Sequence, residues 1–173
     1  MSFTIPNFII PDLVLLALPF LVIACRLCIK NSKLPWRLAC FGLIVVFVLL
    51  NFLPLVGGSG NYFISNWRVD DFGILMREVL TLSALLGLLL AKDYFDHGAD
   101  GKPAMNQIAE FAGTVAFATF GGFIVVSACD LLTFFLGLEM ATIPMYILTA
   151  WNKKDQFGSE AATKSILMGS VAT

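Results

Sequence analysis

A few charged residues lie inside apolar segments of the sequence, where an ionisable side chain is costly and usually has a function. Glu139 is the ninth residue of the apolar run 131–151, which places it ~12 Å from one helix end and near the middle of a bilayer. An isolated carboxyl group at that depth stays neutral, whereas one beside a cation or water exchanges protons near physiological pH. Glu139 is therefore a candidate for a proton relay. The alternative is a protonated carboxyl that hydrogen-bonds a neighbouring helix.

Pro144 and Lys164 are the other residues that bear on such a relay. Pro144 has no N–H to bond the carbonyl of Met140, so we expect a kinked helix and a free carbonyl oxygen that could hold water beside Glu139. Lys164 lies about one turn inside a later apolar segment, where a lysine either contributes to a relay or extends to the membrane surface. The depths of Glu139 and Lys164 from the same membrane side, ~18 Å and ~7 Å, predict no direct contact between them.

Other charged residues favour structural roles. Arg77 and Glu78 are adjacent on one predicted helix, so they do not face each other. We expect Arg77 to extend to the membrane surface or to contact another subunit. Asp130 is expected to cap the helix that follows it. Asp12 and Asn51 are interpreted as interfacial or packing residues.

Several motifs could suggest metal or nucleotide chemistry, but each has a simpler interpretation. Cys25 and Cys28 form a C-x-x-C without a second pair or a histidine, which favours helix packing over metal or redox use. The glycines at 57–60 are not followed by the Gly-Lys-Ser/Thr of a phosphate-binding loop. An exposed acidic loop, not a metal site, is expected from Asp93, Asp96, His97 and Asp100. These motifs therefore predict neither a metal site nor a nucleotide site in this chain.

The composition identifies the elements that must position these residues. Of 173 residues, 58% are hydrophobic and 13% are charged, and the mean hydropathy is +0.86, values far from those of soluble proteins. The formal net charge of -1 does not indicate the basic surface that is typical of nucleic-acid-binding proteins. A spanning helix needs ~20 apolar residues. Such runs predict an all-α, polytopic transmembrane helix bundle with spans at 9–29, 38–56, 72–91, 110–128 and 131–151.

Two further patterns concern the ends of the chain. No lysine or arginine precedes the first run and no small-residue cleavage site follows it, so we expect a retained helix and not a signal peptide. The segment 160–173 begins a sixth apolar run but covers only ~21 Å. We therefore expect the sequence to be the N-terminal part of a longer protein.

The lysines and arginines of the loops predict the orientation of the bundle. Eight basic residues flank the first, third and fifth connections: Arg26, Lys30, Lys33, Arg37, Lys92, Lys102, Lys153 and Lys154. The other side has Arg68 and little else. Because cytoplasmic loops carry the basic excess, the N-terminus is expected outside a bacterial inner membrane. The loop 57–71 is then an outer connection that lies along the membrane surface, and the small residues of 110–128 favour a position inside the bundle.

One pair of motifs resembles a known family. The stretch Asp130-Leu-Leu-Thr-Phe-Phe-Leu-Gly-Leu-Glu139-Met-Ala-Thr-Ile-Pro144-Met-Tyr-Ile-Leu148, followed by Glu160-Ala-Ala-Thr-Lys164-Ser-Ile-Leu-Met-Gly169, resembles the antiporter-like subunits of respiratory complex I. Gly137-Leu138-Glu139 is most similar to the N-subunit branch of proton-pumping NADH:quinone oxidoreductase. Residues from about 130 onward carry the likeness, and the first four runs share it only by hydropathy. The sequence departs from the family at Ser165, where an aromatic residue is common.

The resemblance implies a fold with two inverted repeats of helices, the first of which begins at the fourth helix. Residues 1–109 would then form accessory helices and 110–173 the start of the first proton-translocation repeat. Glu139 and Lys164 match the family's helix-five glutamate and helix-six lysine, both parts of its proton relay. The resemblance also implies that NADH, FMN, iron–sulfur clusters and quinone are bound by other subunits, and that the partners are other complex I membrane subunits, the lipid bilayer and protons.

The sequence therefore predicts a non-redox membrane subunit of NADH:quinone oxidoreductase that takes part in proton translocation. One alternative is a subunit of a cation/proton antiporter or membrane-bound hydrogenase of the same superfamily. Another is a membrane scaffold protein that transports nothing, in which Glu139 only bonds a partner helix.

Overall fold

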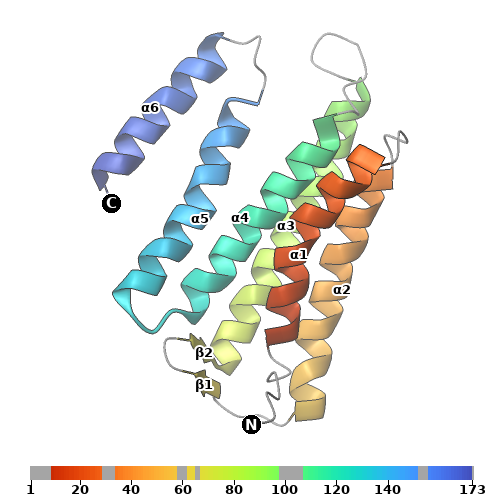
Figure 1. The fold of residues 1–173 in the computed structure, drawn as a ribbon, viewed down its shortest axis with the longest axis vertical. Coiled ribbons are helices and arrows are strands. Elements are labelled where there is room, and N and C mark those ends of the chain that lie inside the picture. The colour runs from red at the N-terminus through yellow and green to blue at the C-terminus, as the bar shows by residue number, and fades with distance from the viewer. Residues whose placement is uncertain are drawn as a thin grey trace.

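The structure is a computed structural model, and it describes residues 9–28, 34–57, 62–64, 67–97, 107–151 and 156–172. The chain forms α1 (Ile10–Cys28), α2 (Leu34–Gly57), β1 (Tyr62–Ile64), β2 (Trp67–Val69), α3 (Asp71–His97), α4 (Ile108–Ser127), α5 (Leu131–Thr149) and α6 (Gln156–Ala172). Successive helices run in opposite directions along one common axis (Figure 1). The predicted all-α bundle is confirmed.

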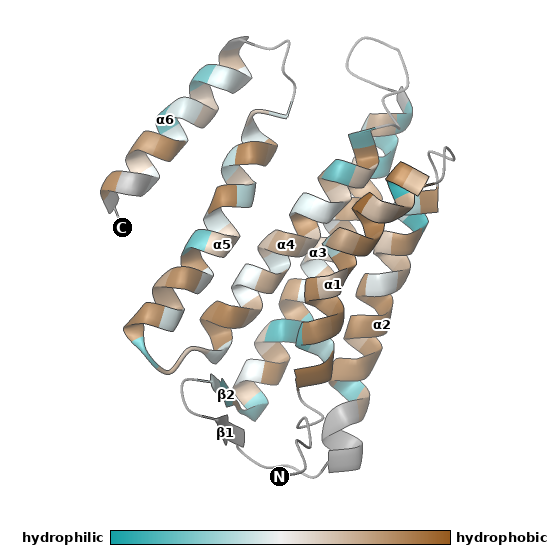
Figure 2. Cartoon of the chain, in the orientation of Figure 1, coloured by the Kyte–Doolittle hydropathy of each residue, from teal (hydrophilic) through white to brown (hydrophobic). Residues whose placement is uncertain are grey.

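The five predicted spans match the helices α1 to α5, which are long and apolar enough to cross a membrane. Most ends agree within a few residues, but α3 continues beyond the apolar run to His97. Its last turns are polar, because hydropathy marks the part of a helix inside the bilayer and not where the backbone hydrogen bonds end. Similarly, α6 begins at Gln156, before the apolar segment expected from residue 160. Figure 2 shows the apolar residues gathered along the helix lengths.

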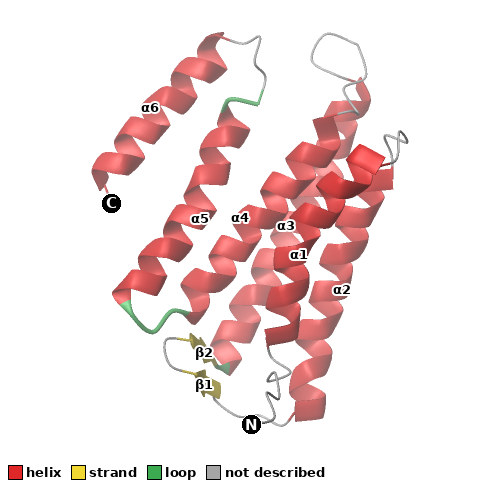
Figure 3. Ribbon diagram, viewed as in Figure 1, coloured by secondary structure: helices red, strands yellow, loops and turns green. Residues whose placement is uncertain are grey.

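A short hairpin, not an irregular loop, precedes α3. β1 pairs antiparallel with β2, with Tyr62 opposite Val69 and Ile64 opposite Trp67. Figure 3 shows these strands in yellow at the end of the bundle where α3 begins. We call this end, where α1, α3 and α5 begin, the hairpin end. Strands of three residues each are too short for an alternating pattern of polar and apolar residues to predict them.

The core lies among the first four helices. Its fully buried residues include Leu15, Val22, Ala39, Leu43, Val46, Leu88, Ala112, Ala116 and Phe123. Of the five spans, α4 is the most buried and α5 the least. The prediction that small residues place this helix inside the bundle is confirmed. α5 and α6 lie to one side, and α5 packs against α4 (Figure 1).

Candidate functional site

The start of α5 is fixed by a capping residue. A side-chain oxygen of Asp130 accepts a hydrogen bond from the backbone N–H of Thr133 at 3.0 Å. This contact satisfies one of the backbone donors that a helix leaves free at its N-terminus. The predicted role of Asp130 is confirmed, and it defines where Glu139 falls along the helix.

Two glycines bring the backbones of α4 and α5 into contact on either side of Glu139. A Cβ atom on Gly121 would lie 2.5 Å from the nitrogen of Ala141 and 2.6 Å from the carbonyl carbon of Met140. A Cβ atom on Gly137 would lie 2.8 Å from the nitrogen of Val125. Only glycine allows this approach. Glu139 is therefore held at a fixed height against α4.

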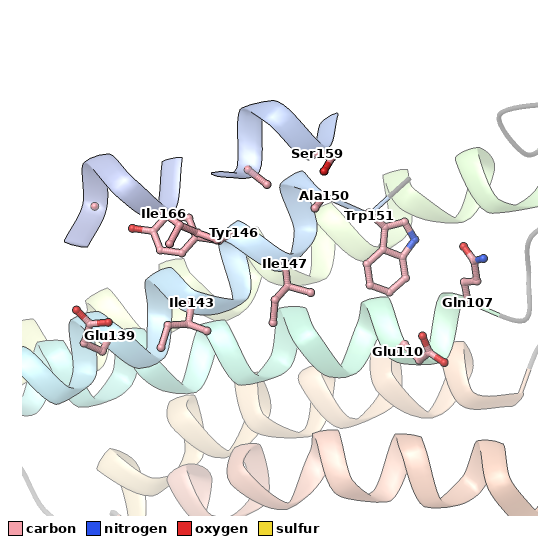
Figure 4. Close-up of a pocket in the computed structure, with 12 residues that line it drawn as sticks. Gln107, Glu110, Glu139, Ile143, Tyr146, Ile147, Ala150, Trp151, Ser159 and Ile166 are labelled. Atoms are coloured by element: carbon pink, nitrogen blue, oxygen red, sulfur yellow. The ribbon is translucent and has the colours of Figure 1, made fainter. Parts of the chain in front are cut away.

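Glu139 opens into a cavity of about 980 Å³ between α4, α5 and α6. The carboxyl group is half-buried, in agreement with its place at the cavity wall. The other lining residues are Gln107, Glu110, Ile143, Tyr146, Ile147, Ala150, Trp151, Ser159, Ala162, Ile166 and Gly169. Figure 4 shows Glu139 at one end of this lining, and Gln107, Glu110 and Trp151 at the other.

The cavity therefore has the carboxyl groups of Glu110 and Glu139 at its two ends, with polar and apolar side chains between them. Tyr146 lies between them on α5, and its hydroxyl lies close enough to Gly169 that a Cβ atom there would collide with it. Glu110 is exposed in the first turn of α4, at the end opposite the hairpin. Glu139 lies ~12 Å from the hairpin end. Water that enters beside Glu110 could thus approach Glu139 along the cavity, which is the arrangement that a relay carboxyl requires.

Lys164 lies on a different face of α6 from the cavity. The residues of α6 that line the cavity are Ser159, Ala162, Ile166 and Gly169, which recur at helical spacing. Lys164 is two residues from both Ala162 and Ile166, which is ~200° around the helix, so it faces the opposite side. Its amino group forms an ion pair with Glu160 at 2.5 Å, and both side chains are exposed, at 68% and 60%. The structure thus does not bring Lys164 to Glu139, and its role in a relay stays a prediction.

Pro144 lies within α5, and it is buried. It is five residues from Glu139, and α5 continues through it as one helix from Leu131 to Thr149, so the kink expected at Pro144 stays a prediction. Because proline has no N–H, the carbonyl of Met140 lacks its usual helical donor. The water that this oxygen could hold stays a prediction.

The expectation for Arg77 was wrong. Its side chain is only 1% exposed and forms an ion pair with Asp12, with 3.4 Å between Nη2 of Arg77 and Oδ2 of Asp12. Arg77 also donates a hydrogen bond to the hydroxyl of Ser127. It therefore neither extends to the surface nor depends on another subunit for its charge partner. Asp12, with a side chain 6% exposed, is buried within the protein, which agrees with the packing interpretation.

Sequence reasoning missed this pair because hydropathy gives the depth of a residue but not the direction it faces. A signal was present in α3, where Gly73, Arg77, Thr81, Ala84 and Leu88 recur every three or four residues and are all buried. Small and polar residues at that spacing indicate a helix face turned to other helices. Asn51, by contrast, is exposed and donates to the carbonyl of Phe47 in its own helix.

The remaining motifs give no metal centre within the part of the chain that the structure describes, where no group of three metal-ligating side chains occurs. Cys25 and Cys28 are free cysteines on α1. Asp93 and Asp96 lie in the last turns of α3. Asp100 and the side chain of His97 lie outside the described residues.

Comparisons with known proteins find similar sequences among membrane subunits of quinone oxidoreductases. Residues 128–173, which include Glu139 and Lys164, match the family described as NADH:quinone oxidoreductase/Mrp antiporter, TM. NADH-quinone oxidoreductase subunit N of Heliobacterium modesticaldum is 36% identical over 135 residues, which are 78% of this chain and 27% of that protein. The chloroplast NAD(P)H-quinone oxidoreductase subunit 2 of Zygnema circumcarinatum is 28% identical over 165 residues, 95% of this chain and 32% of that protein.

A solved structure shares the fold. A chain of respiratory complex I from Thermus thermophilus with bound aureothin matches 94% of this chain and 33% of its own length, with a TM-score of 0.73 and 22% identity. The matched part of this chain therefore spans between about a quarter and a third of the length of these three proteins.

Proposed function

Because the chain is homologous to subunit N of NADH-quinone oxidoreductases, we propose that it is a membrane subunit of such an enzyme and takes part in proton translocation. The enzyme as a whole transfers electrons from NADH to quinone. In this proposal the NADH site, FMN, iron–sulfur clusters and quinone belong to other subunits, and this chain contributes to the path of the protons.

The observation that carries the proposal is the position of Glu139. Its carboxyl group is half-buried near mid-membrane depth and opens into a cavity that also contains Glu110. A carboxyl group in that position takes up a proton when water reaches it and releases the proton when a nearby charge changes. Electron transfer elsewhere in the complex would supply that change of charge. Glu139 is thus a protonatable station, held in place by the contacts of Gly121 and Gly137 with the neighbouring backbone.

Lys164 would act separately from Glu139 in this proposal. Because it lies on the face of α6 turned away from the cavity and is paired with Glu160, its proton-relay partner would come from a helix that covers that face. The exposed apolar side chains of Leu167 and Met168, on the same face of α6 as Lys164, support such a covering.

The wider setting follows from the same homology. We propose 1–109 as accessory helices and 110–173 as the start of a proton-translocation repeat, with other membrane subunits and lipid around them. The basic residues of the first, third and fifth connections in the sequence favour an orientation with the N-terminus outside, and we propose a bacterial inner membrane as the location.

The test is the substitution Glu139→Gln in the assembled complex, which keeps the shape of the side chain and removes its exchangeable proton. We expect proton pumping per NADH oxidised to fall severalfold with little loss of assembled complex. The matched control is Glu78→Gln, since Glu78 is a carboxyl at similar depth on α3 outside the cavity lining. Unchanged pumping in Glu139→Gln would remove the relay assignment and favour a scaffold.

A further inference from the structure

We propose that the hairpin end contains a buried binding site for water between Asp12, Arg77 and Trp67. The site lies on the side of α4 away from Glu139 and does not depend on the proposed function. It is built from α1, α3 and β2, so three separate elements contribute to it.

Burial defines the walls of this site. The side chains of Arg77 and Asp12 are 1% and 6% exposed. The guanidinium carbon of Arg77 lies 6.0 Å from the ring centre of Trp67 and 5.4 Å from that of Phe123. These two rings and the end of α4 at Ser127 enclose the charged pair, so its polar atoms are removed from bulk solvent.

Four polar atoms in this cluster are buried without a hydrogen-bond partner among the described residues. They are both carboxylate oxygens of Asp12, Nε of Arg77 and Nε1 of Trp67. The 3.4 Å between Oδ2 of Asp12 and Nη2 of Arg77 gives Coulomb attraction without a well-formed hydrogen bond. A buried polar group left unpaired costs ~1–3 kcal/mol. Orphaned groups that cluster in this way are the usual environment of internal water.

The chemistry of the four atoms selects the ligand. The Asp12 oxygens need a donor, whereas Nε of Arg77 and Nε1 of Trp67 need an acceptor. A metal cation would satisfy the carboxylate but would be repelled by the guanidinium, and an anion such as chloride accepts but cannot donate. The pair is neutral as a whole, so a neutral molecule that both donates and accepts fits best. Water has these properties and forms two to four hydrogen bonds in such sites.

A polar route connects the site with the surface. Arg68 on β2 is 55% exposed and forms an ion pair with Asp70, at 2.9 Å. Asp70 also accepts the backbone N–H of Gly73, one turn before Arg77 on α3. Opposite charges thus alternate from Arg68 through Asp70 and Arg77 to Asp12, which gives water a polar entrance at the hairpin.

The direct test is a density map of the assembled membrane protein at a resolution that shows ordered water. We expect density within hydrogen-bonding distance of an Asp12 oxygen and of Nε1 of Trp67 or Nε of Arg77. Direct hydrogen bonds from protein donors to both Asp12 oxygens, or a well-defined site without density, would overturn the proposal. Density at metal–ligand distances from Asp12 would replace water with a cation and would also overturn it.

A second measurement distinguishes bound water from surface water. In the full chain in nanodiscs, nuclear magnetic resonance should show magnetisation transfer from water to the indole N–H of Trp67. The internal control is Trp36, whose Nε1 donates directly to the carbonyl of Leu88 at 3.1 Å. The double variant Asp12→Leu/Arg77→Met should abolish the Trp67 signal and leave the Trp36 signal unchanged. A Trp67 signal that persists in the double variant would contradict the proposal.

Discussion

Two polar sites lie on opposite sides of α4, and they differ in how their charges are satisfied. At the hairpin end, Arg77 and Asp12 are almost fully buried and find each other within the chain. On the other side, Glu139 is half-buried and opens into a cavity whose wall on α5 and α6 is largely uncovered. The paired site has the chemistry of an element that holds helices together. The cavity beside Glu139 gives water the access that a proton-exchanging carboxyl group needs.

Removal of one member of the buried pair is the strongest test of this contrast. Arg77→Met leaves Asp12 buried without its cation, and we expect a loss of ~3–5 kcal/mol in the free energy of unfolding. Unfolding in mixed micelles measures this loss. The double variant Asp12→Leu/Arg77→Met should regain most of it, because no charge is then left unpaired. Equal losses in the single and double variants would show that the pair does not act as a unit.

The next largest effect should come from the contact between α4 and α5. Gly121→Ala inserts a methyl group against the backbone of Met140 and Ala141, and we expect a cost of ~1–3 kcal/mol from overpacking. Gly87→Ala is the matched control, since a Cβ atom there meets nothing within 4 Å. In the control, helix propensity should leave stability unchanged or raise it by up to ~1 kcal/mol. A similar response at both positions would mean that the close approach does not hold α5.

The two sites also differ in how far the sequence predicted them. The helices and the depth of Glu139 followed from ~20-residue apolar runs, because bilayer thickness fixes span length. The Asp12–Arg77 pair did not follow, because its members are 65 residues apart and hydropathy carries no information on which helices become neighbours. The strands at the hairpin were too short to give a pattern. The cavity beside Glu139 depends on how α6 packs, which the sequence pattern does not determine.

The cap of α5 should give a smaller effect. Asp130→Ala removes the acceptor for the N–H of Thr133, and we expect a loss of about 1 kcal/mol. Asp130→Asn should restore most of the stability, because an amide oxygen also caps a helix. Hydrogen exchange in the first turn of α5 measures this locally. Faster exchange throughout α1 to α4 as well would contradict a local role of the cap in α5.

The smallest effect is expected at the exposed ion pair of α6. Glu160→Gln removes the partner of Lys164, and we expect a change of no more than ~0.5 kcal/mol, because both side chains are largely in solvent. The same unfolding measurement used for Arg77 makes the two ion pairs directly comparable. Attraction between the charges is similar in kind, but only at the Asp12–Arg77 pair does loss of one partner leave the other charge buried away from bulk solvent. If Glu160→Gln in the assembled complex cost as much as Arg77→Met, Lys164 would lie in a buried environment supplied by a covering helix. The exposed face of α6 would then be a second enclosed polar site.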